Sequence, residues 1–237
     1  MLPHARRVLR ELSEAQTALD ELHLLKRGAL KVGIVQTVNA CVIPEIIERF
    51  SSAHSSVRLT CGEMAVVDIE SELESGRLNL GISFLPPSRK GLAGHQLFDE
   101  ELVAVVAADH PLARRRRLRV CDLANQPMAL LAQRFGTRQM IDRAMAKATV
   151  QPDVKVEMNS VESILSTVKR TQLMTLLPSL ALCQRDAGLK AIAVVEPTPR
   201  WSVGLLWVDG VQCRATAQAF AKITESVLAE RRLKKNP

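Results

Sequence analysis

From Gly28 onward the chain alternates short apolar segments with amphipathic ones, and this alternation constrains the fold more than any other feature. Segments of strand character occur at 29–35, 57–61, 78–84, 97–107, 128–132, 154–158, 189–195 and 203–208, with a short apolar segment at 174–178. Segments of helical character occur at 44–51, 68–75, 137–148, 161–170, 179–186 and 215–232. Strands that alternate with helices predict an α/β fold with a mostly parallel sheet covered on both faces. Two such runs, on either side of about residue 100, indicate two lobes.

Residues 1–27 follow a different period. After Met1 the apolar residues alternate spacings of four and three, as in the seam of a coiled coil: Ala5, Val8, Leu12, Ala15, Leu19 and Leu22. An isolated helix of this length is marginal in water, so we expect dimerisation with the same helix of a second chain. The alternative is an amphipathic helix that packs on its own domain. Lys26, Arg27 and Gly28 are typical of the end of a helix.

The net charge of +7 is concentrated in two places. The arginine run at 114–117 with Arg119, and the basic tail after residue 230, together carry more than the whole excess. We interpret the arginine run as a solvated loop rather than a surface that binds a nucleic-acid groove. Because only 3% of the residues are aromatic and none is Tyr, the stacking platforms of single-strand-binding proteins are not expected.

The five cysteines are too far apart for a disulfide framework or a zinc cluster: Cys41, Cys61, Cys121, Cys183 and Cys213. We expect free, buried thiols in a reducing cytosol. No apolar run approaches the ~18 residues that a membrane span needs. The basic start of the chain is followed by no apolar stretch of the kind found in secretion signals. The sequence therefore predicts a cytoplasmic protein without a membrane partner.

Known catalytic patterns are missing from the sequence. The phosphate loop and the dinucleotide-binding glycine pattern do not occur, and Gly81-Ile82-Ser83-Phe84 lacks the second glycine of a nucleophile elbow. The histidines show no zinc-ligand spacing. Glu100 and Glu101 are neighbours on a strand, so their side chains point to opposite faces and cannot share a substrate. We expect a binding protein that has no catalytic residue, metal or cofactor.

Several motifs follow one another in a familiar order: Gly28 to Gly33 (GALKVG), Ile43-Pro44 with Phe50, Glu63-Met64, Leu73 to Gly81 (LESGRLNLG), Asp109 to Ala113 (DHPLA) and Thr175 to Ala181 (TLLPSLA). Together with the leading seam helix, they resemble the LysR-type bacterial transcriptional regulators over essentially the whole chain. Within that family, residues 135–142 (FGTRQMID) and 159–178 are most similar to the branch that includes the cyanate-operon regulator.

The resemblance implies a domain organisation. Residues 1–27 would form the linker and dimerisation helix. The effector-binding domain would have two Rossmann-like lobes, as in type 2 periplasmic binding proteins, with the ligand between them. Lobe I would comprise 28–99 and 208–232, lobe II 100–207, and 233–237 would be a basic tail. Family members begin with a winged helix-turn-helix, whereas this chain starts inside the linker helix. We therefore expect a homodimer or homotetramer that contacts DNA only through heads this chain lacks.

The first expected effector contact is the corner after the strand at 29–35. In open α/β sheets ligands bind beyond the carboxyl ends of strands, where helix N-termini offer free N–H groups. Gln36, Thr37 and Val38 occupy this corner. The alternative is that Thr37 or Asn39 merely caps the following helix.

The resemblance carries six further effector contacts onto this sequence: Val66, Phe84, Phe135, Thr137, Arg138 and Ser160. Val66 offers only an apolar contact, and Phe84 is either a pocket wall or plain core. Arg138 is a planar cation suited to a carboxylate, although pairing with Asp142 on an exposed helix face is the alternative. Ser160 is a weaker candidate, because its neighbours have the pattern of a helix cap.

These observations predict a sensor domain that binds a small anionic metabolite between its lobes and transmits the signal through oligomer geometry. A free-standing binding protein of the transport type is the alternative, and the absence of a secretion signal and of paired cysteines counts against it. An enzyme on the same fold, such as a dehydratase, is disfavoured because no acid–base pair is evident.

Overall fold

The computed structural model describes residues 28–39, 41–182, 186–211 and 214–235. The predicted linker helix lies outside the described residues, and so does its dimerisation seam of Ala5, Val8, Leu12, Ala15, Leu19 and Leu22. The described chain divides into two compact units. Unit 1 contains residues 28–34, 42–97 and 204–235, and unit 2 contains residues 35–41 and 98–203. Two strands, β4 (Leu92–Ala107) and β10 (Arg200–Val208), pass from one unit to the other.

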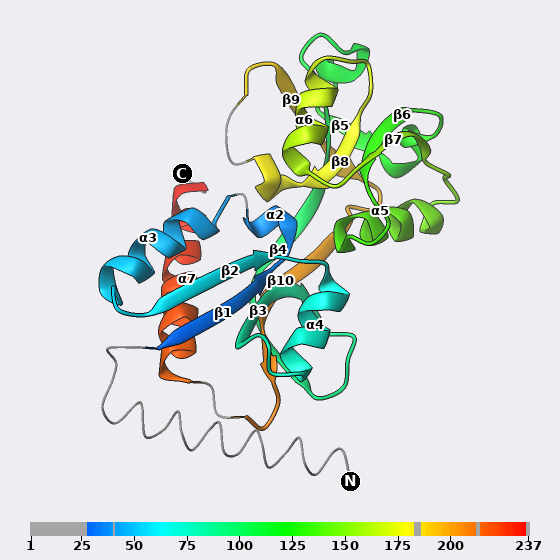
Figure 1. The fold of residues 1–237 in the computed structure, drawn as a ribbon. Helices are drawn as coiled ribbons and strands as arrows, with labels where there is room; N and C mark the ends of the chain where they lie inside the picture. Colours follow the sequence, from blue (N-terminus) through cyan, green and yellow to red (C-terminus); the bar gives the residue numbers. More distant parts are fainter. Residues whose placement is uncertain (1–27, 40, 183–185, 212–213, 236–237) are drawn as a thin grey trace. The chain divides into compact units, whose positions relative to one another are not determined.

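Besides its parts of β4 and β10, unit 1 contains β1 (Ala29–Ile34), α3 (Ile43–Ala53), β2 (Arg58–Glu63), α4 (Val66–Glu74), β3 (Leu80–Leu85) and α7 (Ala215–Lys235) (Figure 1). Its strands follow the order β2-β1-β3-β10-β4, and β1 runs parallel to both β2 and β3. In β1 the side chains of Leu30, Val32 and Ile34 are buried, which is the two-residue period of a strand. On α3, Ile43, Ile46 and Phe50 are buried at helical spacing.

Unit 2 contains α2 (Gln36–Asn39), η1 (Pro111–Arg114), β5 (Arg117–Arg119), η2 (Val120–Leu123), β6 (Pro127–Leu131), α5 (Gly136–Lys147), β7 (Asp153–Met158), α6 (Val161–Lys169), β8 (Thr175–Pro178), η3 (Ser179–Leu182) and β9 (Leu189–Val195). The strand order continues as β10-β4-β9-β5, with β8 also paired to β4, while β6 and β7 form a separate parallel pair.

Strand β6 is buried on both faces, which explains its unbroken apolar sequence. Met128 and Leu130 belong to the core that includes Ile141 of α5. Ala129 and Leu131 face the other way, into the core that includes Ile164 of α6. The two helices that follow β6 and β7 therefore cover opposite faces of this pair.

The observed elements differ from the expectation in three respects. The sheet is mixed, because β8 and β9 run antiparallel to β4. The arginine run is not entirely a loop, because Arg117–Arg119 form β5. Residues 35–41 belong to unit 2, although they were expected in lobe I. A hydrophobic period reports which side chains are buried and carries no information on strand direction or on which distant segment a turn will contact.

Candidate functional site

The carboxyl ends of β6 and β7 define one edge of unit 2. The two strands are parallel, with Pro127 opposite Asp153 and Leu131 opposite Met158. Beyond them the backbone N–H of Ala132 donates to the carbonyl of Met158 at 3.0 Å. Because both strands end here, α5 and α6 both begin at this edge (Figure 1). The predicted residues at 135–138 and Ser160 are therefore brought together.

Gln36 joins the same edge through a contact that spans 123 positions of sequence. Its amide nitrogen, Nε2, donates a hydrogen bond to the backbone carbonyl of Asn159, the residue before the N-cap of α6. The Gln36 side chain is buried, and its amide oxygen, Oε1, has no hydrogen-bond partner among the described residues. This leaves a desolvated acceptor beside the N-terminus of α6, and a buried acceptor without a donor costs ~1–3 kcal/mol.

Thr37 and Val38 are also buried on α2, with 2% and 1% of their surface exposed. The residue that precedes α3 as its N-cap is Val42, and no side chain caps that helix. Thr37 and Asn39 both lie on α2, and neither occupies the N-cap position of α3.

The N-terminus of α5 has no side-chain cap. Phe135 occupies the N-cap position, and it provides no hydrogen-bond acceptor for the first turn. Phe135 itself packs in the core beside α6, with the guanidinium of Arg134 4.7 Å from its ring centroid. Thr137, in the first turn, is 4% exposed. The first N–H groups of α5 point out of the helix without an intrahelical partner, as at any helix start.

Arg138 is buried rather than exposed. Its Nε donates to Asp142 at 2.9 Å, as the spacing of four predicted. Its Nη1 donates to the carbonyl of Leu131 and to Glu157, both at 2.9 Å. Burial opposes the charge, but hydrogen bonds and attraction from the two carboxylates outweigh it and raise the pKa of Arg138 above its ordinary value. The guanidinium therefore stays charged and is held in one position.

Ser160 caps α6 through its hydroxyl oxygen, which accepts from the backbone N–H of Ser163 at 3.3 Å. Ser160 itself forms this cap, whereas its neighbours were expected to form it. The two remaining candidates lie in unit 1. Val66 is the first residue of α4 and is half-buried, and Phe84 is a buried residue of β3.

Three contacts at this edge carried no signal in the sequence: Gln36 with Asn159, Arg138 with Glu157, and Arg138 with the Leu131 carbonyl. Each depends on the pairing or docking of segments that are separated along the chain. Only the Arg138–Asp142 pair, four positions apart on one helix, was accessible to local reasoning.

The described residues contain no group of three or more His, Cys, Asp or Glu side chains that is placed to hold a metal ion. Cys61 and Cys121 are free, whereas Cys41 is disulfide-bonded, so the expectation of free thiols throughout is wrong for Cys41.

Among helices in the described parts of the chain, none has the length and apolarity needed to cross a membrane.

Comparison with known proteins assigns the fold and the family. Residues 24–229 match the model of the LysR substrate binding domain. The DNA-binding transcriptional dual regulator OxyR of Escherichia coli (strain K12) is 25% identical over 225 residues, which cover 94% of this chain and 73% of that regulator. Relatives of this kind are transcriptional regulators.

Solved structures agree on the fold. The regulatory domain of CcmR from Synechocystis PCC6803, in complex with 2-PG, aligns with a TM-score of 0.78 at 20% identity, over 85% of this chain and 98% of that one. The effector binding domain of QuiR, in complex with shikimate, aligns with a TM-score of 0.75 at 20% identity, over 86% and 98%. These alignments confirm the expected α/β fold of the type 2 periplasmic-binding kind.

The motifs at residues 28–33 and 73–81 thus predicted the correct family, while the cyanate-operon branch stays a prediction. The chain belongs to the LysR substrate-binding domain family and is the effector-binding regulatory domain of a LysR-type transcriptional regulator.

Proposed function

We propose that a small anionic metabolite is the effector of this domain, and that it binds at the carboxyl edge of β6 and β7. The observation that carries the proposal is the buried, unpartnered amide oxygen of Gln36 beside the start of α6. Buried polar atoms in native proteins are nearly always satisfied, so an orphan acceptor at a helix edge calls for a donor group on a bound molecule or a water. Gln36, Thr37 and Thr137 supply the polar lining.

The anionic character of the effector is supported by the first turn of α5. Free N–H groups at a helix N-terminus attract negative charge, and this twelve-residue helix has no side-chain cap to compete for them. Arg138 adds a fixed positive charge, and its second terminal nitrogen, Nη2, takes part in none of its three hydrogen bonds. The paired carboxylates of Asp142 and Glu157 are 40% and 47% exposed, so solvent screens part of their charge.

The remaining predicted contacts complete the proposal. Ser160 and Val38 line the same edge of unit 2, and Phe135 forms part of its floor. Val66 and Phe84 lie in unit 1, and their role as effector contacts stays a prediction. The structural neighbours named above were solved with shikimate and with 2-PG, and shikimate is a carboxylate. Both are therefore sensible probes.

In this proposal the domain performs no catalytic step. Effector binding shifts the population of domain conformations, and only a ligand with different affinities for two conformations can do so. The signal would then reach DNA through the winged helix-turn-helix heads of a cytoplasmic homodimer or homotetramer.

The test is a thermal-shift and calorimetric titration of the purified chain with shikimate, 2-PG and inorganic phosphate. Thr137→Val removes one hydroxyl at nearly constant volume and is expected to weaken binding of the responding anion about tenfold. Thr60→Val, on the exposed surface of β2, is the matched control and is expected to leave affinity unchanged. If the anion binds wild type and Thr137→Val with the same affinity, this edge is not the effector site.

A further inference from the structure

Five arginines lie on or directly before β5, the strand that ends the sheet order. All five are exposed, whereas Leu118 between two of them is buried. The backbone around them is held in place. The N–H of Arg115 donates to the Leu112 carbonyl at 2.9 Å, and the carbonyl of Arg116 accepts from Ala193 at 3.3 Å. The arginine run is thus an ordered surface with its side chains in solvent.

Four of these arginines, Arg114 to Arg117, form what we call the arginine edge. Arg119 is neutralised by Asp122, with 3.2 Å between Nη2 and Oδ1. The arginine edge forms no ion pair with any described residue. Four adjacent positive charges lie within about one Debye length of each other and repel. These four residues account for more than half of the net charge of +7. A partner with a dense row of negative charge would relieve that repulsion.

Strand β9, next to the arginine edge, carries no carboxylate. Strand β5 pairs in parallel with β9, with Arg117 opposite Ala193. Ala191 and Ala193 are both exposed on that strand and have the smallest side chain that a β-carbon allows. A polyanion could approach Arg117 over these two alanines.

Although the sequence indicated a merely solvated loop and DNA contact through separate heads alone, we infer from this ordered surface that the arginine edge binds the phosphate backbone of duplex DNA without sequence preference. Arginine stays charged at every physiological pH, and its planar guanidinium bonds phosphate oxygens in pairs. Aromatic side chains that could stack on unpaired bases are scarce in the chain, which favours a duplex over a single strand. Val67 of unit 1 is the sole large apolar side chain exposed in the described residues, which disfavours insertion into a lipid surface.

This inference goes beyond effector sensing and does not depend on the site at β6 and β7. The contact is separate from any DNA-reading head. In a regulator held on DNA by such heads, a weak backbone contact from the sensor domain would act at high effective concentration. The strength of this contact would therefore influence the path of the DNA along the domain.

The test is fluorescence anisotropy of the 237-residue chain with a labelled duplex of arbitrary sequence, at salt concentrations from about 50 to 200 mM. The double variant Arg115→Gln/Arg116→Gln removes two charges and leaves the backbone hydrogen bonds in place. If both residues contact phosphates, the slope of log affinity against log salt becomes shallower by about 1.8. At 50 mM salt we expect affinity to fall at least tenfold.

The matched control is Arg143→Gln/Lys147→Gln, which removes the same charge from the exposed face of α5 in the same unit. We expect its affinity and salt slope to stay close to those of wild type, and thermal melts of all three proteins should coincide. If both double variants lost the same affinity for the duplex, the effect would come from net charge alone, and the inference would be overturned.

Three further outcomes would also overturn it. A wild-type chain that binds no duplex at about 50 mM salt lacks the contact. Aggregation of Arg115→Gln/Arg116→Gln with no change in DNA affinity would assign the arginines to protection of an edge strand. Stronger binding to vesicles of anionic lipid than to the duplex would name a membrane as the partner. Effector affinity, measured separately, is expected to be the same in both double variants.

Discussion

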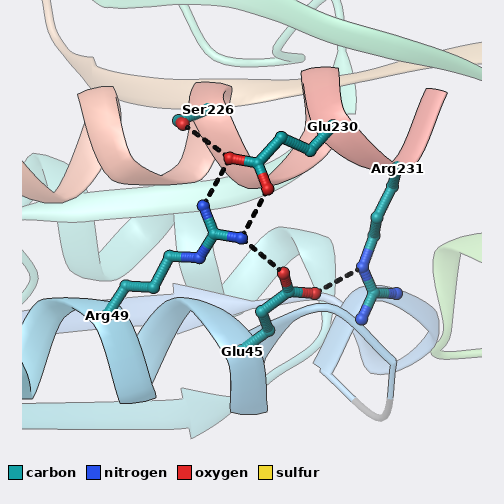
Figure 2. Close-up of polar contacts among 5 residues, drawn as sticks. All are labelled: Glu45, Arg49, Ser226, Glu230 and Arg231. Atoms are coloured by element: carbon teal, nitrogen blue, oxygen red, sulfur yellow. Dashed lines mark hydrogen bonds and ion pairs between the residues drawn. The ribbon is translucent and has the colours of Figure 1, made fainter. Parts of the chain in front are cut away.

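Arg49 on α3 donates hydrogen bonds from Nη1 and Nη2 to the two carboxylate oxygens of Glu230 on α7, at 2.6 and 2.7 Å. Nη2 also reaches Glu45 at 2.9 Å, and the second oxygen of Glu45 accepts from Arg231 at 2.8 Å (Figure 2). The network alternates positive and negative groups across two helices from opposite ends of the described chain. The same helices also meet through the rings of Phe50 and Phe220, whose centroids are 5.4 Å apart.

Removal of Arg49 is expected to destabilise unit 1 only modestly. The side chains of Arg49 and Glu230 are 36% and 44% exposed, so solvent screens much of their attraction. We expect Arg49→Met to lower the melting temperature by about 1–3 °C. Lys222→Met, on the exposed surface of α7, is the control and should change it less. In the double variant Arg49→Met/Glu230→Gln, the melting temperature should fall by less than the sum of the two single decreases. A strictly additive decrease would contradict the coupling of Arg49 and Glu230.

The same network predicts a pH dependence for Glu45. The hydrogen bond from Arg231 is the largest cause that lowers the pKa of Glu45 below its ordinary 4.5, and attraction from Arg231 and Arg49 adds to it. A lowered folded-state pKa stabilises the protein above the unfolded pKa, and this contribution disappears as pH falls through the folded value. Wild type should therefore melt at a higher temperature than Glu45→Gln. This difference should reach its full size above about pH 5 and should shrink below about pH 4. A difference that grows toward low pH would contradict this assignment.

Gly204 in β10 has no room for a side chain. A β-carbon at this position would overlap the backbone carbonyl of His95 and the side chain of Leu85. Because the His95 carbonyl belongs to β4 and cannot rotate away, we expect Gly204→Ala to cost about 1–3 kcal/mol in the free energy of unfolding. Gly62→Ala is the control, since its nearest contact would be the flexible side chain of Met64 at 3.9 Å. Chemical denaturation of both variants measures the difference, and equal midpoints would refute the clash.

Cys61 is expected to react slowly with electrophiles. Burial raises the pKa of its thiol to about 11, because the thiolate loses its hydration. At pH 8 about one thiol in a thousand is then ionised, and the thiolate is the reactive form. Timed labelling with iodoacetamide, followed by peptide mass spectrometry, should show modification of the exposed Cys121 well before Cys61. Equal labelling rates for the native protein would contradict the prediction.

The local sequence predicts the structure where one element decides the outcome by itself. The burial of Leu30, Val32 and Ile34 on β1 follows from the alternation of apolar residues, and Ser160 begins α6 as a capping residue should. The pairing of Arg138 with Asp142 follows from their spacing on one helix turn. The local sequence does not predict the strand at Arg117–Arg119, because a three-residue edge strand exists only through its pairing with β9.

The amino-acid order alone determined the alternation of strands and helices and the family motifs, because hydrophobic period, caps and turns act over a few neighbouring residues. The tertiary structure alone decided that α2 belongs to unit 2 and that Gln36 forms a hydrogen bond with Asn159. It also decided that Arg138 is buried between Asp142 and Glu157, and that β8 and β9 run antiparallel to β4. These outcomes depend on hydrogen bonds between residues far apart along the chain. These hydrogen bonds contribute to the free energy of folding only after the packing of the whole unit has desolvated and aligned both partners.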